Sequence, residues 1–297
     1  MKLENVMKKI DQRIILEEIT VDVAANEIIG LVGRNGSGKT TLFRTIAGHY
    51  QMDEGSIFID GTNLQADPTN RQQIFYIDEK ENFLKHYSLK KINAFYQAAY
   101  PTFDQDLFVR LMQEHELPVH LLYRRMSKGM QGLFQMILAI ASNAKYLLLD
   151  EPFDGLDVIV RKKVIGLLLE NLSETNRTAI IASHNLNELE NLVDRVWLLK
   201  ATTIAKDYQL ENLREQAKKL QMVFKSKKVP EMVKQNSKAL SFQGRVVTAL
   251  FENYTEQLDQ DLRALDPLVL EELPLTLEDL FEANLSKETE LKGLVER

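Results

Sequence analysis

The chain of 297 residues contains no cysteine and only one tryptophan. The missing cysteine excludes disulfide bonds and cysteine-ligated metal centres, and it fits a reducing compartment, where disulfides are rare. No internal repeat or low-complexity tract is present either. The hydrophobic fraction of 44% and the charged fraction of 27% are ordinary for a globular protein. The composition therefore predicts a folded chain with a sizeable core, in one large domain or two modest ones.

The sequence also lacks an apolar run long enough to cross a bilayer. The most apolar long segment, residues 133–149, is interrupted by polar residues such as Ser142, Asn143 and Lys145, whereas a spanning helix needs about 20 predominantly apolar residues. Residues 1–6 have no apolar core of a secretory signal. We therefore expect a chain that is soluble by itself and cytoplasmic, with any membrane association provided by a partner.

An excess of basic residues is missing as well. The 43 acidic residues outnumber the 37 lysines and arginines, which gives a net charge of −6. Proteins that bind nucleic acid usually carry a basic patch or stripe, so no nucleic-acid partner is expected. Residues 214–238 carry eight basic and two acidic side chains, and residues 252–279 carry nine acidic and one basic. We interpret this split as solvated faces of a small C-terminal domain.

The strongest motif present is a phosphate-binding loop. Residues 33–40 read Gly-Arg-Asn-Gly-Ser-Gly-Lys-Thr, a full match to G-x-x-x-x-G-K-[ST] between an expected strand at 27–32 and an expected helix at 41–48. In such a loop the backbone N–H groups and the helix N-terminus attract phosphate. Lys39 would reach the β- and γ-phosphates, and Thr40 would place its hydroxyl on Mg²⁺. The sequence predicts nucleoside triphosphate binding by Gly33, Arg34, Asn35, Gly36, Ser37, Gly38, Lys39, Thr40 and Thr41.

A second pattern is an apolar strand, 146–149, that ends in Asp150 and Glu151. At the C-terminal end of a parallel strand beside the phosphate loop, Asp150 can support the Mg²⁺ shell. Glu151 would then orient or deprotonate the attacking water. An acidic pair alone is also typical of a helix N-terminus. Together with the loop, it indicates triphosphate hydrolysis.

Hydrophobic periodicity gives the organisation of the chain. Residues 1–78 favour strands, residues 88–142 favour helices, with Asp104 as an N-cap, and residues 146–191 alternate strand and helix. The alternation implies a parallel sheet. Residues 206–297 are expected to form a small α/β domain, including a terminal helix near 275–281. The strands are expected at 14–16, 19–23, 27–32, 56–60, 74–77, 146–150 and 178–183, and one helix face at Leu210, Leu213, Ala217 and Leu220.

These motifs, in this order, resemble ATP-binding cassette (ABC) ATPases over residues 1 to about 205. Residues 151–157, Glu-Pro-Phe-Asp-Gly-Leu-Asp, resemble the segment that joins the second acidic motif of the family to its dimer-contact loop. His184, at the end of a predicted strand, is similar to the family's switch histidine. Residues 126–131, Met-Ser-Lys-Gly-Met-Gln, lie where the family's signature motif is expected. The order of five motifs is far more specific than any one of them.

The resemblance implies the fold and the site. The fold is an α/β P-loop ABC cassette: a parallel-sheet core, an antiparallel β subdomain and a helical subdomain at about 80–145, in a domain of residues 1–205 followed by an accessory domain at 206–297. ATP would lie between two cassettes packed head to tail, so that a monomer hydrolyses ATP poorly. The implied catalytic residues are Glu151, His184 and Lys39, the Mg²⁺ ligands Thr40, Asp150 and Glu79, and the residues lent across the dimer Ser127, Gly129 and Asp157.

Several positions depart from the family pattern. Glu79 stands where the family usually has glutamine, which brings the role of this loop in signalling nucleotide state into doubt. Lys128 replaces the first glycine of the signature motif, and Met130 replaces its glutamine. Ile10 stands where an aromatic residue would stack on adenine, so GTP use remains open. The departures at Glu79 and in the signature motif resemble the exporter and antibiotic-efflux branch of the family.

We therefore expect a subunit that powers an ABC exporter through a separate membrane-spanning subunit, on the inner face of the membrane. The helical insertion would form the docking groove for that subunit. Two alternatives stay open: an ABC ATPase that acts on ribosomes or DNA, and a regulatory nucleotide-binding half of a heterodimer. The second cassette is either an identical chain or a related one.

Overall fold

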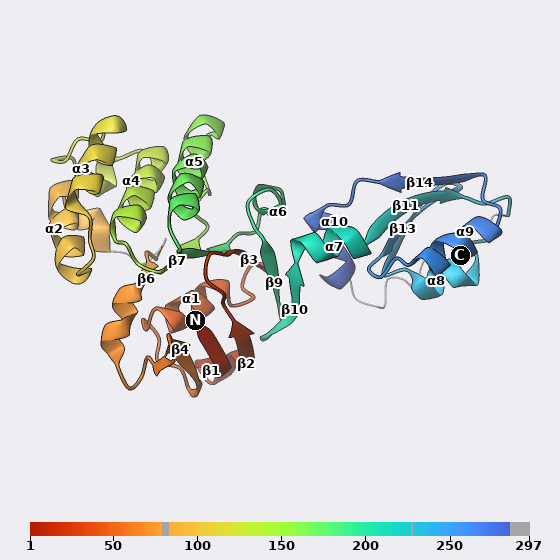
Figure 1. Cartoon of the computed structure of the whole chain (residues 1–297), viewed down its shortest axis with the longest axis horizontal. Coiled ribbons are helices and arrows are strands. Elements are labelled where there is room, and N and C mark those ends of the chain that lie inside the picture. The colour runs from red at the N-terminus through yellow and green to blue at the C-terminus, as the bar shows by residue number, and fades with distance from the viewer. Residues whose placement is uncertain (79–82, 227, 286–297) are drawn as a thin grey trace. The chain divides into compact units, whose positions relative to one another are not determined.

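The computed structural model describes residues 1–78, 83–226 and 228–285 (Figure 1). Contacts divide the chain into two compact units. The first comprises Met1–His184 and Arg195–Asp207, and the second comprises Asn185–Asp194 and the chain from Tyr208 onward. Residues 185–194 thus pack with the second unit, whereas the sequence assigned them to the first domain. No helix among the described residues has the length and apolarity that a bilayer crossing requires.

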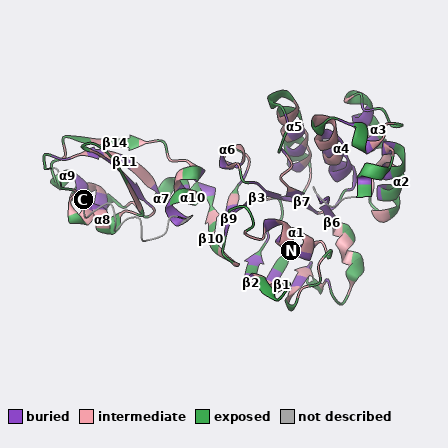
Figure 2. Ribbon diagram, turned by 180° about the vertical axis from the view of Figure 1, so that it is seen from behind, coloured by how far each residue is buried: buried purple, intermediate pink, exposed green. Residues whose placement is uncertain are grey.

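The first unit is built on a six-stranded sheet of order β10-β9-β3-β8-β7-β6. β3 lies between β8 and β9 and is parallel to both, and β7 is parallel to β8 and β6. The inner strands are almost wholly buried, as expected for a parallel sheet covered on both faces (Figure 2). The bounds are β3 Ile28–Val32, β6 Ile74–Tyr76, β7 Tyr146–Asp150, β8 Thr178–Ala182, β9 Arg195–Lys200 and β10 Thr203–Gln209.

An antiparallel sheet of order β2-β1-β4-β5 packs in the same unit. The sequence predicted two strands at 14–16 and 19–23, but the structure has one strand, β2, over this segment. Its pairing with β1 shifts between Val6 and Lys8, opposite Glu18, which has a φ of 49°. This bulge interrupts the alternation of apolar and polar side chains along the strand, and for this reason the sequence predicted two strands. The strands are β1 Lys2–Ile10, β2 Arg13–Asp22, β4 Glu54–Ile59 and β5 Thr62–Asn63.

Helices cover the six-stranded sheet, with α4 and α5 on one side of β3 and β7 and α1 on the other (Figure 1). The predicted N-cap Asp104 is confirmed, because its Oδ1 accepts from Leu107 N at 2.8 Å. Gly129 lets α4 approach α5 closely, since a Cβ there would lie 3.2 Å from Val160. The helices are α1 Lys39–Ile46, α2 Leu89–Ala99, α3 Gln105–Glu114, α4 Lys128–Ala141 and α5 Val158–Glu174, with short 3₁₀ turns at Pro68–Gln73, Phe83–His86 and Tyr123–Arg125.

The second unit contains an antiparallel sheet of order β12-β13-β11-β14, connected β-α-β-β-α-β. The predicted helix face that included Leu220 is wrong. The helix ends at Gln216, and Leu220 lies in β11, which pairs with strands on both sides. The elements are α6 Leu186–Leu189, α7 Leu210–Gln216, β11 Lys218–Val223, α8 Glu231–Asn236, β12 Ala239–Gln243, β13 Val246–Phe251, α9 Glu256–Ala264, β14 Val269–Leu273 and α10 Leu277–Leu285.

Candidate nucleotide-binding site

The phosphate-binding loop connects β3 to α1, as its sequence predicts. Gly36 has a φ of 80° and Gly38 a φ of 106°, a left-handed conformation that favours glycine. At Gly33 a Cβ would lie 2.5 Å from Ser37 Oγ and 2.7 Å from Leu199 O. Only glycine therefore fits at position 33, between the hydroxyl of Ser37 in the same loop and the backbone of β9.

Lys39 begins α1 and is buried, with 7% of its surface exposed. Its Nζ donates to Gly33 O at 2.8 Å, so the ammonium group closes the loop on itself. Burial lowers the pKa of Lys39, and the carboxylates of Glu151 and Asp150 partly oppose this shift. The lysine of the loop and the acidic pair therefore act on one another electrostatically, although they are more than 100 residues apart.

Glu151 and His184 meet at the C-terminal ends of two neighbouring strands. Glu151 follows β7 and His184 follows β8, and Glu151 N donates to Ala182 O at 2.9 Å. Glu151 Oε2 lies 2.9 Å from His184 Nδ1 and also accepts from His184 N at 3.3 Å. The His184 side chain is 52% exposed and that of Glu151 17%. The pair therefore presents a carboxylate, held by a histidine, to a site open to solvent.

The strand order explains why these groups converge. β3, β8 and β7 are neighbours in the sheet and run parallel, so their C-terminal ends lie at the same edge. Each of these strands ends in, or is followed by, a predicted site residue. The loop with Lys39 follows β3, His184 follows β8, and Asp150 and Glu151 end β7. Ligands in α/β proteins bind outside the carboxyl ends of the strands. The four predicted residues thus share the edge where a ligand is expected.

The chemistry of this edge fits a nucleoside triphosphate and Mg²⁺. Ser37 Oγ is buried and, among the described residues, has no hydrogen-bond partner, so a phosphate oxygen would satisfy it. The described part of the chain holds no group of three or more histidine or acidic residues that could bind a metal. Thr40 and Asp150 together are a small oxygen ligand set, which suits Mg²⁺ because it retains waters and binds substrate phosphates. Glu79, the third predicted ligand, lies outside the described residues.

An ion pair that sequence reasoning missed connects α1 to the end of β6. Arg44 Nε donates to Asp78 Oδ2 at 2.5 Å, and Tyr76 Oη donates to the same oxygen at 3.2 Å. Asp78 is buried, at 3% exposure, and its hydrogen bond raises the pKa of Arg44. A charged residue directly after an apolar strand was the available signal. The pair fixes the chain immediately before Glu79 to the helix that follows the phosphate loop.

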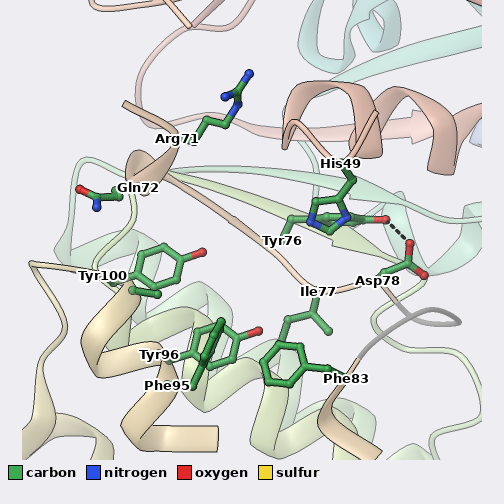
Figure 3. A pocket seen from close by; sticks show the side chains of 11 residues that line it. His49, Arg71, Gln72, Tyr76, Ile77, Asp78, Phe83, Phe95, Tyr96 and Tyr100 are labelled. Atoms are coloured by element: carbon green, nitrogen blue, oxygen red, sulfur yellow. Dashed lines mark hydrogen bonds between the residues drawn. The ribbon is translucent and has the colours of Figure 1, made fainter. Parts of the chain in front are cut away.

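A cavity of about 330 Å³ lies beside this ion pair (Figure 3). Its aromatic wall comes from α2 and Phe83, and the side opposite comes from His49, which follows α1, and from the end of β6 and the residues after it. Phe95 is 52% exposed, and its ring lies 4.6 Å from that of Phe83. The His49 ring lies 5.2 Å from that of Tyr76. The main lining residues are His49, Tyr76, Asp78, Phe95, Tyr96 and Tyr100.

The residues predicted to act across a dimer make local contacts on their own helices. Ser127 caps α4, with its Oγ accepting from Met130 N at 3.2 Å. Asp157 caps α5, with its Oδ1 accepting from Ile159 N and Val160 N at 2.9 and 3.0 Å. Both caps are exposed. Val158 and Ile159, in the first turn of α5, are 63% and 70% exposed. The helix tips that carry Ser127 and Asp157 are therefore accessible to another molecule.

Comparison with known proteins agrees with this geometry. Residues 16–154 match the family model described as ABC transporter. The ABC transporter ATP-binding protein YtrB of Bacillus subtilis (strain 168) is 32% identical over 280 residues, which cover 94% of this chain and 96% of that protein. The lipopolysaccharide export system ATP-binding protein LptB of Haemophilus influenzae is 29% identical, over 68% of this chain and 87% of that protein.

Solved structures show the same fold. A protein described as the ATP-binding subunit of an ABC transporter superposes with a TM-score of 0.65 at 24% identity. The match covers 72% of this chain and 91% of the solved one. The similarity to YtrB along nearly the full length of both chains, together with the phosphate loop and the acidic edge, establishes that this chain belongs to the ABC transporter ATP-binding proteins and is an ABC ATPase.

Proposed function

We propose that this chain is the ATP-binding and ATP-hydrolysing subunit of an ABC exporter and that it acts through a separate membrane-spanning subunit. The observation that carries the hydrolytic part is the contact between Glu151 and His184 at the edge that also holds Lys39. A carboxylate held within 2.9 Å of a histidine suits a base that receives the proton of an attacking water.

Each residue has a role in this proposal. Lys39 and the backbone N–H groups of the loop would bind the β- and γ-phosphates of ATP. Thr40, Asp150 and Glu79 would hold Mg²⁺, which supplies charge neutralisation at the phosphate oxygens when bound. Glu151 would accept the proton of the water. His184 would orient Glu151 through its Nδ1 and contact the γ-phosphate with its exposed face. The remaining loop residues, Gly33 to Gly38 and Thr41, would shape the phosphate cradle.

The proposed active unit contains two cassettes packed head to tail. Ser127 and the backbone N–H of Gly129 of one cassette would bind the γ-phosphate held by the other, since a helix N-terminus attracts anions. Asp157 would contact the same interface. The exposed Val158 and Ile159 beside Asp157 support this arrangement, because large apolar side chains on a surface gain stability when a partner covers them.

A mixing experiment tests the head-to-tail arrangement. Lys39→Ala and Ser127→Ala chains should each be nearly inactive alone, because every site in their homodimers lacks one required group. In a mixed dimer, one site combines the intact Lys39 of one chain with the intact Ser127 of the other. An equal mixture should therefore recover about a quarter of the wild-type ATP turnover per chain.

The control is a mixture of Lys39→Ala with the double variant Lys39→Ala/Ser127→Ala, which contains no intact site and should stay inactive. Turnover is measured by phosphate release at protein concentrations well above and well below the dimer dissociation constant. A mixture of the single variants with no recovered turnover would contradict the arrangement, as would full activity of the Ser127→Ala chain alone.

The cavity beside α2 is the proposed docking site for the membrane subunit. It combines exposed aromatic rings with the segment that leads from β6 toward Glu79, so a bound partner would contact the nucleotide site through Asp78 and Arg44. Tyr87 and Phe83, 42% and 41% exposed, extend this aromatic surface. The exporter assignment follows the resemblance of the residues at position 79 and in the signature motif to the exporter branch of the family. The chain would then sit on the cytoplasmic face of the membrane.

Replacing Phe95 by alanine should reduce recovery of a tagged chain with its membrane subunit by about tenfold or more, as loss of an aromatic anchor does at protein interfaces. ATP binding should stay unchanged, because Phe95 lies on α2, whereas the phosphate loop connects β3 to α1. The matched control is Val109→Ala on α3, which is 42% exposed in the same helical part. Purification from membranes, followed by transport measurements in inverted vesicles, checks both the partner and the direction. Equal recovery of both variants, or net import, would contradict the proposal.

A further inference from the structure

The second unit contains a cavity that the ATPase chemistry does not use. It has a volume of about 440 Å³ and is lined by residues that follow β11, by Phe242 of β12, by the turn that joins β12 to β13 and by Val247 of β13. A volume of this size is ordinary for small-molecule sites. Its main lining residues are Phe224, Ser226, Lys228, Phe242, Arg245 and Val247.

The cavity is basic in a protein that is acidic overall. Lys228 and Arg245 line it, and none of the described lining residues is acidic. Other lysines of this unit have partners: Lys218 pairs with Glu272 at 2.7 Å, and Lys219 pairs with Asp279 at 2.7 Å. Within the described part of the chain, Lys228 and Arg245 form no ion pair. Two cations that line one cavity, and that have no ion-pair partner among the described residues, favour an anionic ligand.

The same cavity has an apolar floor. Phe224 and Val247 are buried, at 6% and 4% exposure, and Phe242 of the edge strand β12 is 40% exposed. An exposed phenyl ring beside two cations is a suitable surface for a flat apolar group, because aromatic rings bury large areas on stacking. The ligand chemistry is therefore mixed, with a negative group for the cations and a planar body for Phe242.

We propose that the second unit binds a small organic anion whose carboxylate or phosphate group is held by Lys228 and Arg245 and whose planar body covers Phe242. This site is distinct from the proposed nucleotide site, since its lining residues all belong to the second unit. The inference holds whichever direction the transporter works.

The test measures binding of 2-naphthoate to the full-length chain by fluorescence titration, with the nucleotide site saturated by ADP. A carboxylate probe is chosen because a phosphate would also compete for the loop at Lys39. We expect a saturable site, and we expect 2-naphthol, which lacks the charge, and acetate, which lacks the ring, to bind about tenfold more weakly or worse. Absence of saturable 2-naphthoate binding would overturn the proposal.

Variants locate the site. Arg245→Gln and Lys228→Gln should each weaken 2-naphthoate binding by about tenfold, because each removes one charge-assisted contact. Phe242→Ala should weaken 2-naphthoate and leave acetate unchanged. The matched control is Lys238→Gln, an exposed lysine of the same unit that does not line the cavity. Thermal melting verifies that each variant folds. Equal losses in the Arg245 and Lys238 variants, or 2-naphthol binding as tight as that of 2-naphthoate, would overturn the assignment.

Discussion

Replacement of Glu151 by glutamine is expected to lower ATP turnover by about 10²- to 10⁴-fold, the range for loss of a general base. Glutamine has the same shape and keeps an oxygen that accepts a hydrogen bond near His184, but its amide cannot take a proton from water at neutral pH. The backbone at position 151 has a φ of 49°. Glutamate and glutamine branch alike near the backbone, so the substitution adds no new strain there. ATP binding should therefore remain.

The measurement pairs ATP turnover with nucleotide binding and size-exclusion chromatography. With ATP present, the Glu151→Gln chain should elute as a dimer, because the bound triphosphate holding two cassettes together is no longer cleaved. The matched control is Asp154→Asn, an exposed acid three residues further along the same turn, which should keep wild-type turnover. Undiminished hydrolysis by the Glu151→Gln chain would exclude Glu151 as the base.

Replacement of Arg177 by alanine is expected to lower the free energy of unfolding of the first unit by about 3–5 kcal/mol, since it removes a large buried side chain together with its hydrogen bonds. The guanidinium is 6% exposed and donates to the carbonyls of Ala139, Ile140 and Ala144 at 2.7, 3.0 and 2.7 Å. Two of these carbonyls, those of Ala139 and Ile140, belong to the last turn of α4, where they also accept from Ser142 Oγ at 2.7 Å and Asn143 N at 3.3 Å. Burial lowers the pKa of Arg177 to about 10, so the group stays charged at neutral pH.

The single tryptophan provides the probe. Trp197 lies fully buried in β9 of the first unit, so its fluorescence during urea unfolding reports on that unit. The control is Arg110→Ala, an exposed arginine of α3, which should change the free energy of unfolding by no more than about 0.5 kcal/mol. Equal midpoints for the two variants would show that Arg177 contributes no more than a surface arginine.

The sequence by itself determined those features whose residues lie close together along the chain. The phosphate loop needs glycine at defined positions between one strand and the helix that follows it, and residues 33–40 have glycine at those positions. Asp104 caps its helix through an N–H only three residues away. The acidic end of β7 is likewise a local pattern, an apolar run followed by two carboxylates.

Contacts between distant segments could be decided only by the tertiary structure. The strand order β3-β8-β7 brings Glu151 to His184 and places both beside Lys39. The Arg44–Asp78 pair and the Arg177 contacts with α4 likewise join residues 34 or more positions apart. In the second unit, β11 is a strand because β13 and β14 pair with it, although the spacing of Leu213 and Leu220 also fits a helix. Local propensity is weak compared with strand pairing and burial, so the secondary structure at these positions is set by the segments that pack against them.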